Sequence, residues 1–217
     1  MKLFELDVNN RGSVAFCWGR FQPPHLAHGN LFRMLEQYGS YDFWICAGQT
    51  VDAKNPLDFQ TKMSFVKQQF PEYASHVLDD PMVKTIFQAV VAIYNKYDPA
   101  VSESLSLIYV GDFNRVSNFV PGLNKFNGVE SKHGYYKFKE IKSAATKRDV
   151  DSETNSTIAD PNQDVGLINS ANISGSLVRN LAKTDQFDKF KKTVSKTGEE
   201  PWVKQMFFAL GGKTINQ

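Results

Sequence analysis

The chain has 217 residues, of which 41% are hydrophobic and 13% aromatic, enough to build one domain with a packed core. Its 25 lysine and arginine residues nearly balance 23 aspartate and glutamate residues, so the formal net charge of +2 gives no sign of nucleic-acid binding. No apolar run reaches membrane-spanning length, and the acidic residues near the start do not suit a signal peptide, so we expect a soluble cytoplasmic protein.

Short apolar runs alternate with helical patterns over the first half of the chain. We predict strands at 13–18, 41–48, 76–78 and 104–110, and helices at 25–38, 59–70 and 85–97. This alternation predicts an α/β fold, a Rossmann-like parallel sheet with helices on both faces. Ligands of such sheets bind beyond the carboxyl ends of the strands, where Gly19, Gly48 and Gly111 are located.

The two cysteines, Cys17 and Cys46, lie within predicted strands. No residues with metal-ligand spacing surround them, so we expect two small core residues rather than a metal site. Cysteines that are buried and unpaired also agree with a reducing intracellular environment.

The pattern changes near residue 123, where we predict a lid-like insertion over about 123–172. It contains one predicted strand, 135–141, and a polar stretch, 146–163, typical of a mobile surface loop. A lid over an active site and a surface excursion without a role are both compatible with that stretch. Helices are predicted at 174–182, 187–194 and 202–210. We find no repeat and no domain boundary, so 1–217 is predicted to be a single domain.

Two segments far apart in the chain have the composition of phosphate-binding helix starts. The first, residues 19–28, has the sequence GRFQPPHLAH and places His25 and His28 three residues apart where a helix is predicted to begin. The second, residues 173–179, has the sequence ISGSLVR and places two hydroxyls and a guanidinium on the first turns of another helix. Backbone N–H groups at a helix start favour anions, and imidazoles can donate hydrogen bonds to phosphoryl oxygens. Capping or surface histidines are the alternative.

These two segments resemble the two signatures of the HIGH-motif nucleotidylyltransferases, written H-x-G-H and I-S-x-[ST]-x-[IV]-R, and they occur in the expected order. The resemblance implies that His25 and His28 contact the triphosphate and stabilise the pentavalent transition state. It implies that Ser174 and Ser176 bind the β- and γ-phosphates, and that Arg179 neutralises the leaving pyrophosphate.

The same resemblance extends the candidate site to residues around the phosphates. Lys62 matches a catalytic basic position, and the further nucleotide-binding candidates are Gly19, Arg20, Phe21, Gln22, Gly111, Asp112 and Ile173. The family chemistry implies Mg²⁺ bridging the phosphates, held by substrate and water with no metal ligand from the protein. Ala27 stands where the first signature usually has Gly. We expect the added methyl group to be tolerated, with a binding-only protein as the alternative.

For the acceptor, the first signature and Gln49 resemble archaeal-type nicotinamide mononucleotide adenylyltransferases. In that group an Asp followed seven residues later by Trp holds the nicotinamide; here Asp80 and Phe87 stand at this spacing. A Phe ring can also stack on a pyridinium, although packing of Phe87 within its own helix is the alternative. The resemblance implies transfer of AMP from ATP to a phosphorylated acceptor such as nicotinamide mononucleotide, with Asp80, Phe87 and Gln49 as acceptor-binding residues.

A second resemblance, to bacteriophage proteins described as cytidylyltransferase-like, covers residues 111–112, 115–116, 118–119, 125–128, 135–138 and 147–149. It keeps open an enzyme that uses CTP, or a phage nucleotide-binding or structural protein without turnover, located in the host cytoplasm. Lys147 and Arg148 are the lid residues expected to fold over bound phosphates. The expected partners are a nucleoside triphosphate and a small phosphorylated acceptor, with no nucleic acid and no membrane. Apolar residues within 202–210 can cover the core or a second copy in a homo-oligomer.

Overall fold

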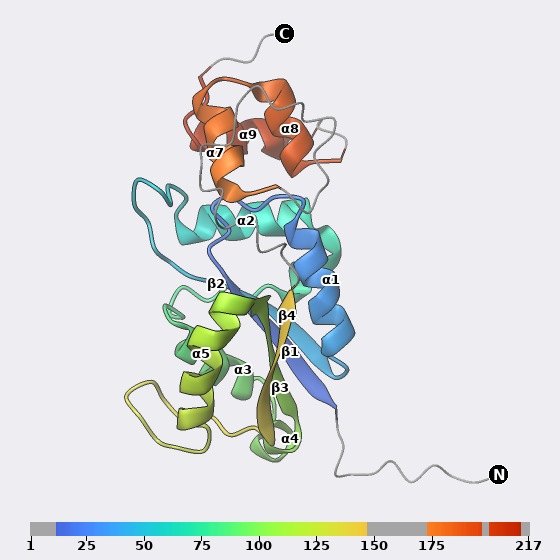
Figure 1. The fold of residues 1–217 in the computed structure, drawn as a ribbon, viewed down its shortest axis with the longest axis vertical. Coiled ribbons are helices and arrows are strands. Elements are labelled where there is room, and N and C mark those ends of the chain that lie inside the picture. The colour runs from blue at the N-terminus through green and yellow to red at the C-terminus, as the bar shows by residue number, and fades with distance from the viewer. Residues whose placement is uncertain (1–11, 147–172, 197–199, 214–217) are drawn as a thin grey trace, which may run out of the picture.

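The computed structural model describes residues 12–146, 173–196 and 200–213. Its described strands form one four-stranded, all-parallel sheet in the order β2-β1-β3-β4 (Figure 1). The strands are β1 (Ser13–Gly19), β2 (Asp42–Ala47), β3 (Ser106–Asp112) and β4 (Glu140–Thr146). Helices surround this sheet, so the predicted Rossmann-like α/β fold is confirmed.

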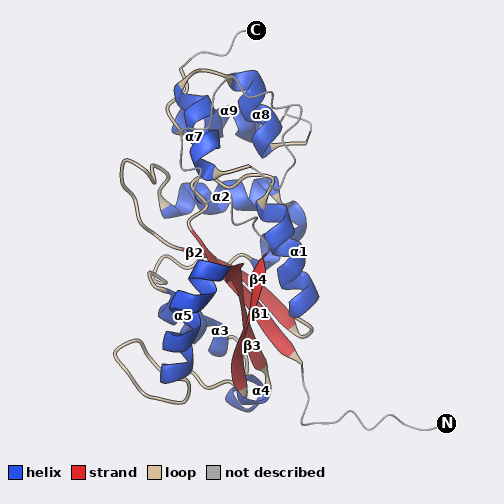
Figure 2. Ribbon diagram, viewed as in Figure 1, coloured by secondary structure: helices blue, strands red, loops and turns tan. Residues whose placement is uncertain are grey.

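Most of the helices lie on the two faces of the sheet or beyond the carboxyl ends of its strands, and α4 lies near the amino end of β3 (Figure 2). Their bounds are α1 (His28–Tyr38), α2 (Phe59–Gln69), the 3₁₀ helix η1 (Pro71–His76), α3 (Ile86–Tyr94), α4 (Pro99–Ser104), α5 (Phe113–Phe126), α7 (Gly175–Lys183), α8 (Phe187–Val194) and α9 (Pro201–Ala209). α3 and α5 lie on one side of the sheet and α1 on the other. α2 separates the sheet from α7, α8 and α9 (Figure 1).

The central strand β1 is buried on both faces, as its continuous apolar run predicts. Val14 and Phe16 pack with residues of α3, while Ala15 and Cys17 pack with residues of α1 and α2. This division follows from the alternation of side chains along a strand. Cys17 and Cys46 are both buried core residues, as predicted, and burial raises the pKa of the Cys17 thiol to about 12.

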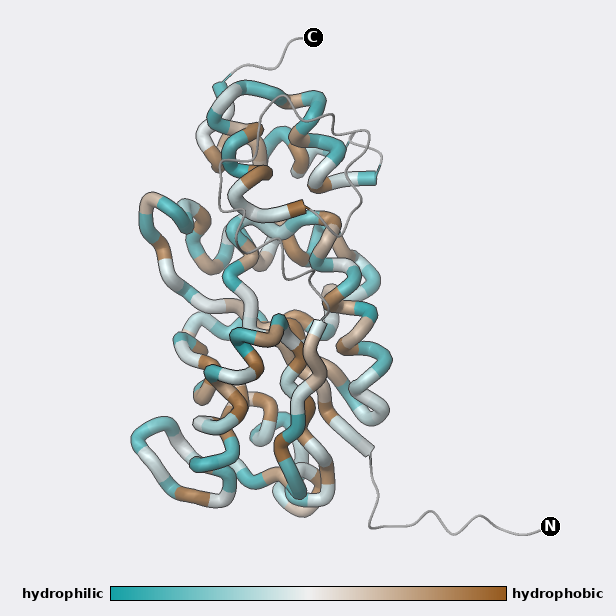
Figure 3. The backbone as a smooth tube through the Cα atoms, viewed as in Figure 1, coloured by the Kyte–Doolittle hydropathy of each residue, from teal (hydrophilic) through white to brown (hydrophobic). Residues whose placement is uncertain are grey.

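The C-terminal helices form a third apolar cluster with α2. Trp202, Met206, Phe207 and Leu210 are buried in it, whereas Phe208 is about half exposed. Hydrophilic and hydrophobic stretches alternate along these helices, as expected when one side of each helix is buried (Figure 3). The predicted helices at 174–182, 187–194 and 202–210 are therefore confirmed, and most of the apolar side chains of the last one cover the core of their own chain.

Two strand predictions need correction. Residues 71–76 form η1 instead of leading into a strand at 76–78, and only Val77 makes a parallel bridge, to Ile45. The strand predicted at 135–141 begins at Glu140, because Tyr136 and Phe138 are core residues of the preceding loop. Their alternating apolar pattern reflects packing against the core rather than pairing of the backbone.

The region predicted as an insertion is partly built into the sheet layer. Residues 123–126 form the end of α5. The sequence analysis did not predict this helix, which contains Pro121. Residues 140–146 form β4, which pairs with β3 along its whole length. Lys147 and Arg148, the predicted lid residues, lie outside the described residues.

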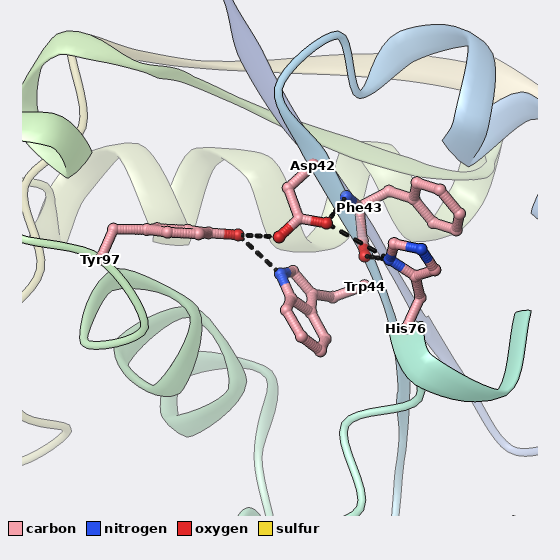
Figure 4. A network of polar contacts seen from close by, with 5 residues as sticks. All are labelled: Asp42, Phe43, Trp44, His76 and Tyr97. Carbon is pink, nitrogen blue, oxygen red and sulfur yellow. Dashed lines mark hydrogen bonds and ion pairs between the residues drawn. The ribbon is translucent and has the colours of Figure 1, made fainter.

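Side chains cover the outer edge of β2 (Figure 4). The Phe43 backbone N–H donates to Asp42 Oδ1 at 2.7 Å, and His76 Nδ1 lies 3.1 Å from the Phe43 carbonyl oxygen and 3.3 Å from Asp42 Oδ1. The Tyr97 hydroxyl donates to Asp42 Oδ2 at 2.5 Å and accepts from Trp44 Nε1 at 2.8 Å. Unpaired backbone groups at a strand edge are templates for pairing with another chain, and here side chains occupy the N–H and carbonyl groups of Phe43.

Candidate active site

The topology of the sheet places a crevice beyond the carboxyl ends of β1 and β3. The chain proceeds from β1 to β2 on one side and crosses to β3 on the other, which makes this a topological switch point. Gly19 ends β1, and Gly111 and Asp112 end β3. A Cβ atom on Gly111 would lie only 3.1 Å from the ring of Tyr109, so this position favours glycine.

Arg115 ties the ends of β1 and β3 together through an ion pair and a hydrogen bond. Asp112 caps α5 by accepting from the Arg115 backbone N–H at 2.9 Å, and its Oδ2 lies 3.3 Å from Arg115 Nε. Arg115 Nη1 also donates to the Trp18 carbonyl oxygen at 2.6 Å. Arg115 was absent from the candidate site residues, although an Asp and an Arg three residues apart at a helix start indicate such a pair.

The histidine pair of the first signature is assembled as a compact turn. α1 begins at His28, later than predicted, and His25 precedes the helix; the two imidazole centroids are nevertheless 3.9 Å apart. The His25 backbone N–H donates to His28 Nδ1 at 3.0 Å. Because Nδ1 accepts this bond, the neutral His28 ring carries its proton on Nε2.

Phe21 supports this turn from within the protein. Its ring is buried, lies edge-on to His28 at 4.9 Å and covers Gly19, where an added Cβ would come within 2.5 Å of the Phe21 ring. The backbone of Phe21 has φ of 45°, in the left-handed region. The structure therefore places Phe21 behind the histidine and gives Gly19 a packing role.

Ala27, the departure from the first signature, fits its position. Its φ of −62° and ψ of −23° are ordinary right-handed helical values, which alanine adopts without strain. Its side chain packs against the C-terminal cluster, and the neighbouring Leu26 N–H donates to the Thr193 carbonyl oxygen at 3.0 Å. The C-terminal helices thus hold the turn that carries the histidines.

The two signatures are in direct contact. Arg179 Nη1 donates to the Gln22 carbonyl oxygen, and a Cβ on Gly175 would lie 2.8 Å from that oxygen. The side chain of Gln22 is buried and exchanges two hydrogen bonds with the backbone of Leu57, at 2.6 and 2.9 Å. Gln22 therefore connects the first signature to the 49–58 loop and to α7 at the same time.

The start of α7 presents the hydroxyls of the second signature. Ser174 is the N-cap, with Oγ accepting from the Leu177 N–H at 3.2 Å, and Ser176 Oγ accepts from Arg179 Nη2 at 3.2 Å. Both serines are exposed, whereas Ile173 is buried in the C-terminal cluster.

Positive charge accumulates between the signatures. Burial, and then the like charge of the exposed Arg20, lower the pKa of Arg179, while Asp52 opposes this shift. An anion bound between the two guanidinium groups would relieve their repulsion.

Lys62 lies at the carboxyl ends of β1 and β2. Its side chain is only 1% exposed, and its ammonium donates to the carbonyl oxygens of Gly48 and Arg20. Burial lowers its pKa to about 8, with partial compensation from Asp58. A buried lysine whose pKa is lowered toward neutral pH is typical of active sites.

A cavity of about 400 Å³ extends from these strand ends to the start of α3; we call it the α3 cavity. Its described lining residues are Trp18, Arg20, Gly48, Gln49, Thr50, Lys62, Lys84, Thr85, Ile86, Phe87, Phe119 and His133. Of the predicted acceptor residues, Gln49 and Phe87 line it. Gln49 Nε2 donates to the carbonyl oxygens of Pro81 and Val83, at 2.8 and 2.9 Å.

Asp80 is not brought to this cavity. It lines a separate hollow of about 670 Å³ beside Trp44 and Lys96, and its Oδ1 accepts from the Met82 N–H at 2.8 Å. The structure therefore separates Asp80 from Phe87, the pair that the sequence spacing had suggested.

Within the described ranges, no group of three or more His, Cys, Asp or Glu side chains is arranged to hold a metal ion. In the same part of the chain, no helix is both long and apolar enough to cross a membrane. The two signature segments supply cations, imidazoles and hydroxyls, groups that suit phosphate oxygens.

An α/β sheet whose switch point joins a histidine turn to a Ser–Arg helix start defines a HIGH-motif nucleotidylyltransferase. The comparison with known families agrees: the model described as cytidylyltransferase-like matches residues 16–181, and the chain belongs to this family. Membership supports nucleotidyltransferase activity. A comparison with curated proteins finds no match.

Proposed function

We propose that this protein transfers a nucleoside monophosphate from a nucleoside triphosphate, preferentially ATP, to a phosphorylated acceptor such as nicotinamide mononucleotide, and releases pyrophosphate. The observation that carries the proposal is the contact of Arg179 with the Gln22 carbonyl oxygen, because it brings together residues 157 positions apart, from the two segments to which the proposal assigns phosphate binding. The histidine turn lies on one side of that contact and the α7 hydroxyls on the other.

The proposed chemistry needs positioning and charge neutralisation rather than a covalent enzyme intermediate. An oxygen of the acceptor phosphate attacks the α-phosphorus in line. The bond from that phosphorus to the α–β bridging oxygen breaks, and pyrophosphate leaves with the electron pair. His28, with its proton on Nε2, donates a hydrogen bond that strengthens as charge develops on the phosphoryl oxygens. Arg179 and the start of α7 neutralise the leaving pyrophosphate.

Mg²⁺ belongs to this proposal as an ion carried by the triphosphate. The described site offers no carboxylate set to hold the ion by itself, and Mg²⁺ commonly stays bound to phosphates and water. When bound, the ion supplies charge neutralisation at the phosphates. Arg20, Lys62, Ser174 and Ser176 would then orient the oxygens that the ion leaves available.

The α3 cavity supports binding of a phosphorylated acceptor next to the phosphate site. Arg20, Lys62 and Lys84 line it, and no carboxylate is among its described lining residues, so an anionic group is favoured there. A volume of about 400 Å³ falls within the range of small-ligand sites.

Pyrophosphate release tests the proposal. ATP or CTP is supplied with Mg²⁺ and with nicotinamide mononucleotide, ribose 5-phosphate or glycerol 3-phosphate, and the wild type is compared with His28→Ala. We expect release with ATP and nicotinamide mononucleotide, and none from the variant. Turnover with CTP alone would assign the cytidylyl activity that the family description suggests. Tight nucleotide binding without turnover of any pair would overturn an enzymatic function.

A further inference from the structure

We propose that His133 binds the acceptor: with Phe87 it forms an aromatic wall of the α3 cavity, so the acceptor contains a planar ring in addition to its phosphate. This inference rests on the proposed function, which predicts a phosphorylated acceptor but does not involve His133.

The α3 cavity combines two kinds of lining. Arg20, Lys62 and Lys84 provide positive charge, while the other described side chains include the rings of Trp18, Phe87, Phe119 and His133. Aromatic rings bind planar rings through offset stacking and edge contacts, whereas an aliphatic phosphate gains little from them. A cavity with both features is suited to an aromatic mononucleotide.

His133 lies against Phe87 in a stacked geometry. The centroids of the imidazole and phenyl rings are 4.5 Å apart, and the angle between their planes is 19°. Phe126 meets both rings nearly at right angles, at 5.6 Å from Phe87 and 5.4 Å from His133. The imidazole thus covers one face of Phe87 and adds to the cavity lining a ring that also has hydrogen-bonding nitrogens.

The loop that carries His133 is fixed to the core. Gly134 has φ of 95°, and a Cβ there would lie 3.2 Å from Val91 of α3, so the backbone packs directly on that helix. Tyr136 is buried and its hydroxyl donates to the Leu123 carbonyl oxygen at 2.8 Å. The Ser131 hydroxyl accepts from the His133 N–H at 3.2 Å. A ring held in this way needs little ordering when a ligand binds, which favours affinity.

The test compares His133→Ala and His133→Phe with Lys132→Ala, an exposed neighbour in the same loop. Calorimetry measures binding of nicotinamide mononucleotide and of glycerol 3-phosphate, and steady-state kinetics measure KM for acceptor and for triphosphate. For His133→Ala we expect acceptor binding to weaken about tenfold and acceptor KM to rise equally, with kcat and triphosphate KM unchanged. His133→Phe keeps the stacking, so its affinity for the acceptor should fall about threefold or less.

The outcomes separate this inference from the proposed function. Unchanged binding of nicotinamide mononucleotide in His133→Ala would overturn the role of His133, whether or not the wild type turns over. Equal wild-type affinity for glycerol 3-phosphate would overturn the planar-ring requirement. Normal ring-dependent binding without pyrophosphate release would instead overturn the proposed enzymatic reaction while leaving the binding role of His133 in place.

Discussion

The phosphate end of the site and the α3 cavity are built in different ways. The phosphate end consists of two short contiguous segments, 19–28 and 173–179, whose own backbone and side chains meet. The α3 cavity is lined by residues from β1, α2, α3, α5 and the loops between them, which come from separate parts of the chain and include the short runs 48–50 and 84–87. Phosphate binding needs adjacent N–H groups, hydroxyls and cations, which a helix start supplies locally. Acceptor binding depends on surfaces that form only when the chain has folded.

His28→Ala tests the phosphate end with the largest expected effect. Because we propose that this imidazole donates to the developing charge, we expect kcat to fall about 1,000-fold. The melting temperature should drop modestly, since the His25 N–H loses its acceptor and the ring contacts with His25 and Phe21 are lost. Single-turnover measurements would show whether the loss is in the chemical step. Gln37→Ala, an exposed change on the same helix, is the control. A His28→Ala enzyme with more than a tenth of the wild-type rate would contradict the assigned role.

Arg179→Ala should have the next largest effect, lowering kcat about 100-fold and raising KM for the triphosphate. It removes both the charge at the pyrophosphate and the bond to the Gln22 carbonyl oxygen. Arg179→Lys keeps the charge without the planar fork and should recover part of the loss. Lys183→Ala, at the end of the same helix, provides the reference. Equal rates for the alanine and lysine variants would mean that charge is not what Arg179 contributes.

Lys62 lies between the phosphate end of the site and the α3 cavity. Because it is buried, we expect the stability of the protein to depend on pH. Its pKa is lowered to about 8 in the folded protein, so folding carries a cost below pH 8 that is relieved as the pH rises toward 10. The free energy of unfolding of the wild type minus that of Lys62→Met should therefore increase by about 2 kcal/mol from pH 7 to pH 10, because the wild type gains stability as the pH rises.

Denaturant unfolding at several pH values measures this difference, and Lys67→Met, a partly exposed change in the same helix, controls for loss of a lysine. A difference for Lys62→Met that does not vary with pH would show that its ammonium is well solvated.

Phe87→Leu tests the α3 cavity and Asp80→Asn is its comparison outside that cavity, with the smallest expected effect. We expect acceptor KM to rise about tenfold for Phe87→Leu, since stacking is lost but helix packing is kept. Asp80→Asn should change acceptor KM less than about twofold, because Asp80 lines another hollow and Asn can still accept the Met82 N–H. Initial rates at varied acceptor concentration measure both. A larger rise in acceptor KM for Asp80→Asn than for Phe87→Leu would instead support the Asp80–Phe87 acceptor site that the sequence spacing suggested.

The difference between contiguous segments and residues brought together by folding also explains what the sequence could predict. The parallel sheet and the C-terminal helices follow from apolar periodicity, and both signatures were recognisable because each is contiguous. Arg115 and His133 were not recognised as site residues. The spacing of Asp112 and Arg115 indicates their ion pair, but it does not show that Arg115 also reaches the Trp18 carbonyl oxygen, and no local pattern shows that the loop of His133 packs on α3. Tyr136 and Phe138 misled the strand prediction for a related reason: alternation along a chain also arises when a loop fills a core.

The hydrogen bond from Leu26 to the Thr193 carbonyl oxygen has a consequence for biosynthesis. A ribosome releases the histidine turn long before it has made α7 and α8. A nascent chain that ends after β4 contains all four described strands, yet it lacks Arg179, both signature serines and the carbonyl that anchors the turn. The proposed phosphate site is therefore complete only late in translation, after the strands of the described sheet have been made.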